Sequence, residues 1–277
     1  MSSGGTPAPR KARGGWTLSD EEAQTLVYNA RRAFFVMVGI LALLWIIQVI
    51  SEYIVGTTTI DHQQIPRLIE DYGIFPRDVG RLPDILSAPF LHFSWTHIEG
   101  NSGPLFIFGF LAAYRGLGKF ALVTLVVVLT SGLAAWFFES PGSVGAGASG
   151  VVFGYFGYIM VRGIFDRRLI DVLIGAVMAL CFAYQFSVLL PHQGIGYQAH
   201  IGGLAGGVLA GWLFMDRRAA QARRTVKAGK AAPAGATQAS GSVALPGNQP
   251  AKSGKGFTVD PSNPRADLYK QLDDLGL

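Results

Sequence analysis

The sequence predicts an all-α polytopic membrane protein, a bundle of six transmembrane helices with disordered cytoplasmic tails. Of the 277 residues, 50% are hydrophobic and only 15% are charged, whereas soluble domains carry about 25% charged residues. The apolar residues gather in long runs that can span a bilayer. The basic residues flank these runs and do not form a polar face, so we expect a lipid bilayer and no nucleic acid as a partner.

The N-terminal part divides at about residue 30. Residues 1–30 are rich in Gly, Ser, Pro and charge, and are predicted to form a tail with a short helix near 19–30 that Ser19-Asp-Glu-Glu22 can cap. This polar start contains no short apolar segment before a cleavage site, so we expect no cleavable signal peptide. The eighteen apolar residues 33–50 are long enough for a first transmembrane helix.

The rest of a six-helix domain is expected to extend to residue 217. A long mixed loop over 56–96 precedes five further spans, predicted at about 97–114, 120–138, 149–161, 172–190 and 201–215. Residues 218–277 are basic and then rich in Ala, Gly, Pro and Ser, a composition typical of a disordered tail. A short helix can form at the end of this tail, over 264–277.

The distribution of Lys and Arg predicts the orientation. Twenty of the 23 lie in the two tails and in the turns at 115–119 and 162–168, and only Arg67, Arg77 and Arg81 lie in the other loops. By the positive-inside rule both termini are then cytoplasmic in a multi-pass protein of the cell membrane. An even number of spans agrees with this orientation, and it places the loops 56–96, 139–148 and 191–199 outside.

A loop rich in glycine and alanine leads directly into Ser149. Residues 143–150 read Ser-Val-Gly-Ala-Gly-Ala-Ser-Gly, and an apolar run follows directly. Such a loop lets backbone N–H groups approach a reacting carbonyl, and the start of a helix points free N–H groups toward developing negative charge. The pattern therefore fits a nucleophile beside an oxyanion hole. It also fits small-residue packing between membrane helices, without catalysis.

Polar residues gather at the predicted outer helix ends, although they are far apart in sequence. His97 and Asn101 open the second span, Ser149 opens the fourth and His200 opens the sixth. The fourth and sixth apolar runs are only about 13–15 residues long, roughly 20–23 Å of helix against a hydrocarbon core of about 30 Å. Ser149 and His200 are therefore expected to lie in a water-accessible pit below the outer surface.

Glycines at helical spacing predict close approach of the last span and the fourth. They are Gly203, Gly207 and Gly211 on one span and Gly150, Gly154 and Gly157 on the other. The apolar spans contain no Asp or Glu, so a Ser149–His200 dyad is a simpler arrangement than a triad. His97 and Asn101, one turn apart, can donate to an oxyanion. Alternatively, His97 is an interface histidine and Asn101 makes an interhelical hydrogen bond.

Together these motifs resemble the rhomboid intramembrane serine proteases. The similarity covers roughly residues 30–217, and it rests on His97-xxx-Asn101, Gly147-Ala-Ser149-Gly and Ala199-His200-Ile-Gly-Gly203. It implies that Ser149 is the nucleophile, that His200 is its partner, and that His97, Asn101 and the Ser149 N–H form the oxyanion hole. It also implies that the loop 56–96 dips into the membrane.

Two positions depart from patterns seen in some members of that family. Phe153 stands four residues after the serine, where some members carry a tyrosine that packs on the histidine; a phenyl ring can still stack on His200. A Trp-Arg pair of the first loop is absent. His92 matches another histidine often seen in the external loop, and we assign it no catalytic role. We expect no metal and no cofactor, because the histidine spacing is poor for zinc and Cys181 is the single cysteine.

The predicted function is therefore a serine endopeptidase that cleaves transmembrane segments of membrane proteins near the extracytoplasmic side. One alternative is a rhomboid-like pseudoprotease that binds membrane clients without cutting them. Retention of Ser149 and His200 argues against it. The other alternative is a small-solute transporter, for which inverted repeats or a buried charge relay would be expected.

Overall fold

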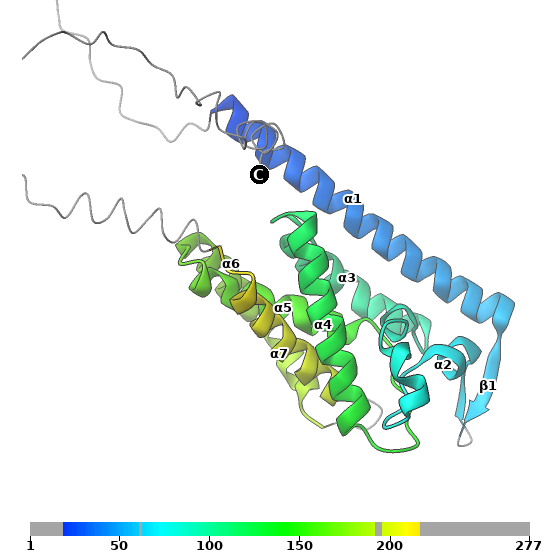
Figure 1. Ribbon diagram of the computed structural model, residues 1–277. Coiled ribbons are helices and arrows are strands. Elements are labelled where there is room, and N and C mark those ends of the chain that lie inside the picture. The colour runs from blue at the N-terminus through cyan, green and yellow to red at the C-terminus, as the bar shows by residue number, and fades with distance from the viewer. Residues whose placement is uncertain (1–18, 61–62, 192–195, 217–277) are drawn as a thin grey trace, which may run out of the picture. The chain divides into compact units, whose positions relative to one another are not determined.

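The computed structural model describes residues 19–60, 63–191 and 196–216 (Figure 1). The chain divides into two units, residues 1–230 and 231–277, and every described residue belongs to the first. The described helices are α1 (Asp20–Ile50), η1 (Ser51–Val55), α2 (Arg67–Tyr72), η2 (Val79–Ile85), η3 (Ala88–Phe90), α3 (Trp95–Ala113), α4 (Leu117–Phe138), α5 (Ser149–Phe165), α6 (Leu169–Cys181), η4 (Ala183–Leu189) and α7 (Tyr197–Leu213). The predicted C-terminal tail and its helix over 264–277 lie outside the described residues, so the predicted domain limits stay predictions.

Helix α1 joins two segments that the sequence analysis separated. The predicted cap is confirmed: Ser19 Oγ accepts from the Glu22 N–H at 3.2 Å, and a Glu22 carboxylate oxygen accepts from the Ser19 N–H at 3.0 Å. From this cap the helix runs unbroken to Ile50. Arginine is a good helix former, so the polar Arg31-Arg32 pair lies between the two segments without breaking the helix.

The predicted helical membrane fold agrees with the described residues, and the long loop 56–96 adds one short sheet to it. In this loop β1 (Thr57–Ile60) pairs with β2 (Gln63–Pro66) in antiparallel orientation. The β-branched run Thr-Thr-Thr-Ile favours this strand. The fifth span is not one helix over 172–190: α6 ends at Cys181, and η4 turns from it by 66°. Hydropathy is similar on both sides of the bend and does not reveal it.

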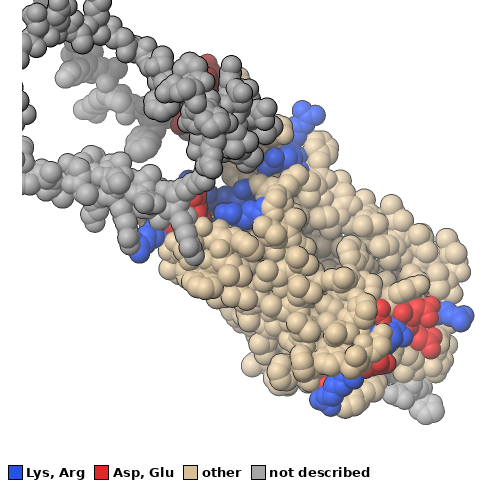
Figure 2. All heavy atoms as spheres, viewed as in Figure 1, with Lys and Arg blue, Asp and Glu red and all other residues tan. Residues whose placement is uncertain are grey.

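Length and apolar composition identify two described helices that can cross a membrane, Asp20–Val55 and Leu117–Phe138. The bent pair α6 and η4 adds a third if the two cross together, and α5 is a shorter apolar helix. On the face drawn in Figure 2, the charged side chains of the described residues gather toward the two ends, with other residues between them. This distribution suits a protein whose middle contacts hydrocarbon. The count of six spans stays a prediction.

Helix α7 packs against α5 through the predicted glycines and against α4 through Gly202 and Gly206, which the sequence analysis did not single out. A Cβ atom on Gly203 would overlap the carbonyl oxygen of Gly150, and one on Gly207 would overlap that of Gly154. These backbones are therefore close enough to exclude any side chain between them, as small-residue packing of membrane helices allows. The contact brings the first turns of α5 and α7 together.

Charged side chains connect α3, α5 and α6 at the helix ends that lie far from Ser149. Arg162, at the end of α5, donates to the Leu111 carbonyl oxygen of α3 at 2.8 Å and pairs with Asp171 of α6 at 3.4 Å. Arg115 also pairs with Asp171. Buried charges need such partners. The network connects α3, α5 and α6 at the ends remote from Ser149.

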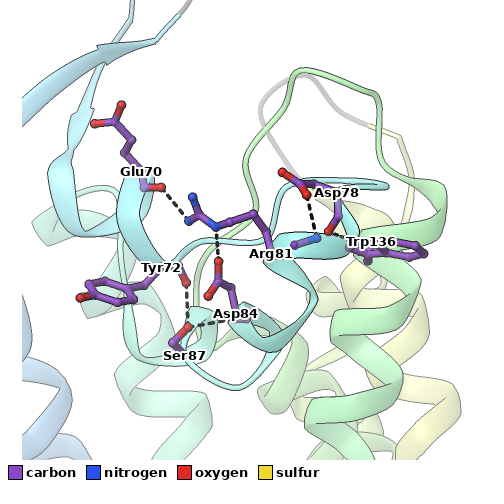
Figure 3. A network of polar contacts seen from close by, with 8 residues as sticks. Glu70, Tyr72, Asp78, Arg81, Asp84, Ser87 and Trp136 are labelled. Atoms are coloured by element: carbon purple, nitrogen blue, oxygen red, sulfur yellow. Dashed lines mark hydrogen bonds and ion pairs between the residues drawn. The ribbon is translucent and has the colours of Figure 1, made fainter.

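The segment between β2 and α3 is tied to the C-terminal end of α4 (Figure 3). Trp136 donates its indole N–H to the Asp78 carbonyl oxygen at 2.9 Å, and its own carbonyl accepts from the Arg77 N–H at 3.0 Å. Arg81 donates to the Glu70 carbonyl oxygen at 2.7 Å and pairs with Asp84. These bonds hold the segment in a defined position before the chain enters α3.

Candidate active site

Ser149 is the first residue of α5, as the glycine-rich pattern predicted. The loop before it contains Gly147 at φ +131°, a conformation that L-residues with side chains rarely adopt. The first N–H groups of an α-helix lack intrahelical acceptors. The serine hydroxyl therefore lies beside a group of donors oriented along the helix start.

His200 lies in the first turn of α7, next to Ser149. Its Nε2 atom is 2.8 Å from Ser149 Oγ, and the residue is only 7% exposed. The ring of Phe153 stacks on the imidazole, with centroids 4.7 Å apart and planes inclined by 26°. Phe153 therefore stacks on His200 as the sequence analysis allowed, but its side chain offers no hydroxyl group.

The second nitrogen of His200 also has a partner. Its Nδ1 atom is 3.0 Å from the carbonyl oxygen of Val188, in η4. A carbonyl oxygen can only accept, so Nδ1 carries the proton and Nε2 presents its lone pair to the serine hydroxyl. Nothing in the residue type of Val188 signals this contact, because it is made by the main chain.

His97 and Asn101 lie in the first two turns of α3, which Ser94 caps by accepting from the His97 N–H at 3.2 Å. A Cβ atom placed on Gly147 would lie 2.9 Å from His97 Nε2 and 3.8 Å from Ser149 Oγ, so both side chains border the same point of the loop. Asn101 is buried, and its Nδ2 has no hydrogen-bond partner among the described residues. Both residues can thus offer a donor.

His92 contacts the loop that precedes Ser149. The residue is 1% exposed, its Nε2 accepts from the Ala148 N–H at 3.3 Å, and its ring packs edge-on against His97 at 5.1 Å. Burial, and to a smaller extent the nearby His97, lowers the pKa of His92 to about 3, so the ring stays neutral and can accept. The sequence signalled His92 only by its resemblance to a frequent loop histidine.

No metal centre accompanies this site in the described part of the chain, where no group of three or more His, Cys, Asp or Glu side chains could hold an ion. The arrangement comprises a hydroxyl, an imidazole and several buried or backbone N–H donors. These are the components of acyl transfer by a serine nucleophile.

Comparison with known proteins identifies the domain in which these residues lie. The family model of the Rhomboid domain matches residues 79–217, which include all the residues of the site described above. An uncharacterized protein of Mycobacterium tuberculosis is 32% identical over 163 residues, covering 55% of this chain and 68% of the relative. The rhomboid protease GlpG of Haemophilus influenzae is 31% identical over 137 residues, covering 48% and 69%. The putative rhomboid protease YdcA of Bacillus subtilis is 29% identical over 136 residues, covering 48% and 68%.

The matched domain spans half of the chain, and the two named relatives GlpG and YdcA align over more than two thirds of their own length. The apolar helices agree with the membrane location that this domain implies. The chain is therefore an integral membrane protein of the rhomboid family.

Proposed function

We propose that this protein is an intramembrane serine endopeptidase that cleaves transmembrane segments of membrane proteins near their extracytoplasmic side. The observation that carries the proposal is the 2.8 Å separation of Ser149 Oγ and His200 Nε2. The Val188 carbonyl oxygen, 3.0 Å from Nδ1, favours the tautomer that leaves Nε2 free to accept the hydroxyl proton. Relatives named as rhomboid proteases support the same class of activity.

In the proposed reaction, Ser149 Oγ attacks the scissile carbonyl carbon while its proton moves to His200 Nε2. The C–N bond then breaks, and His200 returns the proton to the leaving amine. Water then attacks the ester carbonyl while His200 takes its proton, the C–O bond to Ser149 breaks, and His200 returns the proton to Ser149 Oγ, which releases the acid and the free serine. Each step uses the same two side chains, so no further acid or base is needed.

The oxyanion of the tetrahedral intermediate is proposed to accept from His97, the Asn101 amide and the Ser149 N–H. The unpartnered Nδ2 of Asn101 supports this role, because a buried donor without an acceptor is costly unless a ligand supplies one. The expected substrates are membrane proteins with a transmembrane helix, which enter from the lipid. Both termini of the enzyme are proposed to be cytoplasmic.

Cleavage of a membrane-anchored reporter in proteoliposomes tests the proposal. Wild-type protein should cut the reporter near the outer end of its transmembrane helix, and Ser149→Ala should abolish the cut while leaving the thermal unfolding temperature in place. Equal cleavage by a folded Ser149→Ala protein would exclude Ser149 as the nucleophile.

A further inference from the structure

We infer that the main-chain carbonyl of Val188, in η4, is the group that orients His200. This inference rests on the proposed serine chemistry and adds a positioning residue to it. In Ser-His-Asp triads a carboxylate holds the tautomer of the histidine and stabilises its cation. The described part of the chain places no carboxylate in hydrogen-bond contact with His200, and Val188 O lies 3.0 Å from its Nδ1.

The sequence leaves this carbonyl available. Within η4 the 3-10 pattern pairs each carbonyl with the N–H three residues on, as in the 3.2 Å bond from the Leu190 N–H to Ser187 O. The next bond of the series would run to Val188 O from residue 191. That residue is Pro191, which has no N–H to give. The helix therefore ends with an acceptor that the histidine can use.

The position of the carbonyl depends on how η4 packs, because η4 follows a bend of 66° after α6. The Phe186 ring lies 5.6 Å from that of Phe156 on α5, and the Phe182 ring lies 4.8 Å from that of Phe108 on α3. Phe108 and Phe156 are fully buried, whereas Phe186 is 40% exposed. Phe186 is thus the aromatic contact of η4 that can be changed at least cost to the core.

The Val188 carbonyl, a neutral dipole, should act on His200 at two points of the reaction. Before attack, the Nδ1–H bond keeps the lone pair on Nε2, facing Ser149 Oγ. After proton transfer, His200 is a cation and the same bond becomes charge-assisted, which strengthens it. Loss of a histidine's orienting partner commonly costs roughly 10–100-fold in activity at metal sites, and we expect a fall of that size here.

The test measures the rate at which a fluorophosphonate probe labels Ser149, as a function of pH, in Phe186→Ala, Phe186→Leu and wild-type protein. Phe186→Ala should slow labelling by roughly 10–100-fold, and Phe186→Leu should restore most of the rate. Leu180→Ala is the matched control: its side chain is 79% exposed on α6, just before the bend, and its rate should equal that of the wild type.

Nitrogen NMR of ¹⁵N-histidine-labelled protein provides the readout that a purely structural effect would not change. His200 should carry its proton on Nδ1 in the wild type and lose this preference in Phe186→Ala. An unchanged rate, or a slower rate with an unchanged tautomer, would overturn the inference. If Phe186→Ala fails to fold, Pro191→Ala replaces it, since the new N–H competes for Val188 O and should also slow labelling; a wild-type rate in that variant overturns the inference. Failure of the wild type to react at Ser149 would instead refute the proposed function.

Discussion

Gly147→Ala tests whether the loop before Ser149 holds His97 in place. The new Cβ would lie 2.8 Å from His97 Cε1, and ordinary contact begins at 3.4 Å, so the ring must retreat by about 0.6 Å. A misplacement of about 1 Å can cost roughly 100-fold in rate. We therefore expect kcat to fall roughly 10–100-fold. The φ of +131° adds backbone strain, which costs on the order of 1–3 kcal/mol of stability.

Gly142→Ala separates the two effects. Gly142 also has a positive φ, +87°, but a Cβ there meets nothing within 4 Å. It should lose stability without losing kcat. Reporter cleavage in proteoliposomes gives kcat, and thermal unfolding in one detergent gives stability. Equal losses of kcat in the two variants, or a wild-type kcat in Gly147→Ala, would refute the assignment of the His97 contact.

Three further predictions concern other parts of the site and its support. Asn101→Ala should lower reporter cleavage by about 10²–10³-fold without abolishing it, because other donors remain; cleavage at the wild-type rate would make Asn101 a packing residue. The pKa of His92 falls from 6.5 in the unfolded chain to about 3 in the folded protein. Between these two pH values only the unfolded chain binds the proton, so thermal stability should rise as the pH rises from about 3 to 6.5. His92→Asn should weaken that rise, and an identical pH dependence would contradict it. Trp136→Phe removes the donor to Asp78 O and should cost about 0.5–1.5 kcal/mol of stability in thermal unfolding, with faster proteolysis within 75–87; unchanged proteolysis would contradict the anchoring role.

Much of the site could be predicted because its chemistry lies in side chains at recognisable spacings. The capping box at Ser19 and the helix start at Ser149 both follow from local sequence, and both are present. The glycines of α5 and α7 likewise predicted the close approach that brings His200 to Ser149. Local pattern sufficed wherever a residue type dictated the contact.

The remaining features depend on contacts that residue types do not specify. The bend after Cys181 interrupts a run that stays apolar throughout, so hydropathy cannot locate it. Val188 contributes a carbonyl oxygen, which every residue carries. His92 supports the Ala148 N–H from 56 residues away in sequence, and only the fold brings the two together.

Mass spectrometry of protein treated with a fluorophosphonate tests the central claim most directly. Attack by Ser149 Oγ on phosphorus, with loss of fluoride, should leave one adduct per wild-type molecule on the peptide that contains Ser149. Ser149→Ala should carry no adduct. His200→Ala should react far more slowly, because its Ser149 hydroxyl has lost the base that lies 2.8 Å away in the wild type. An adduct on another serine, or equal labelling in all three proteins, would contradict the claim that Ser149 and His200 form the catalytic pair.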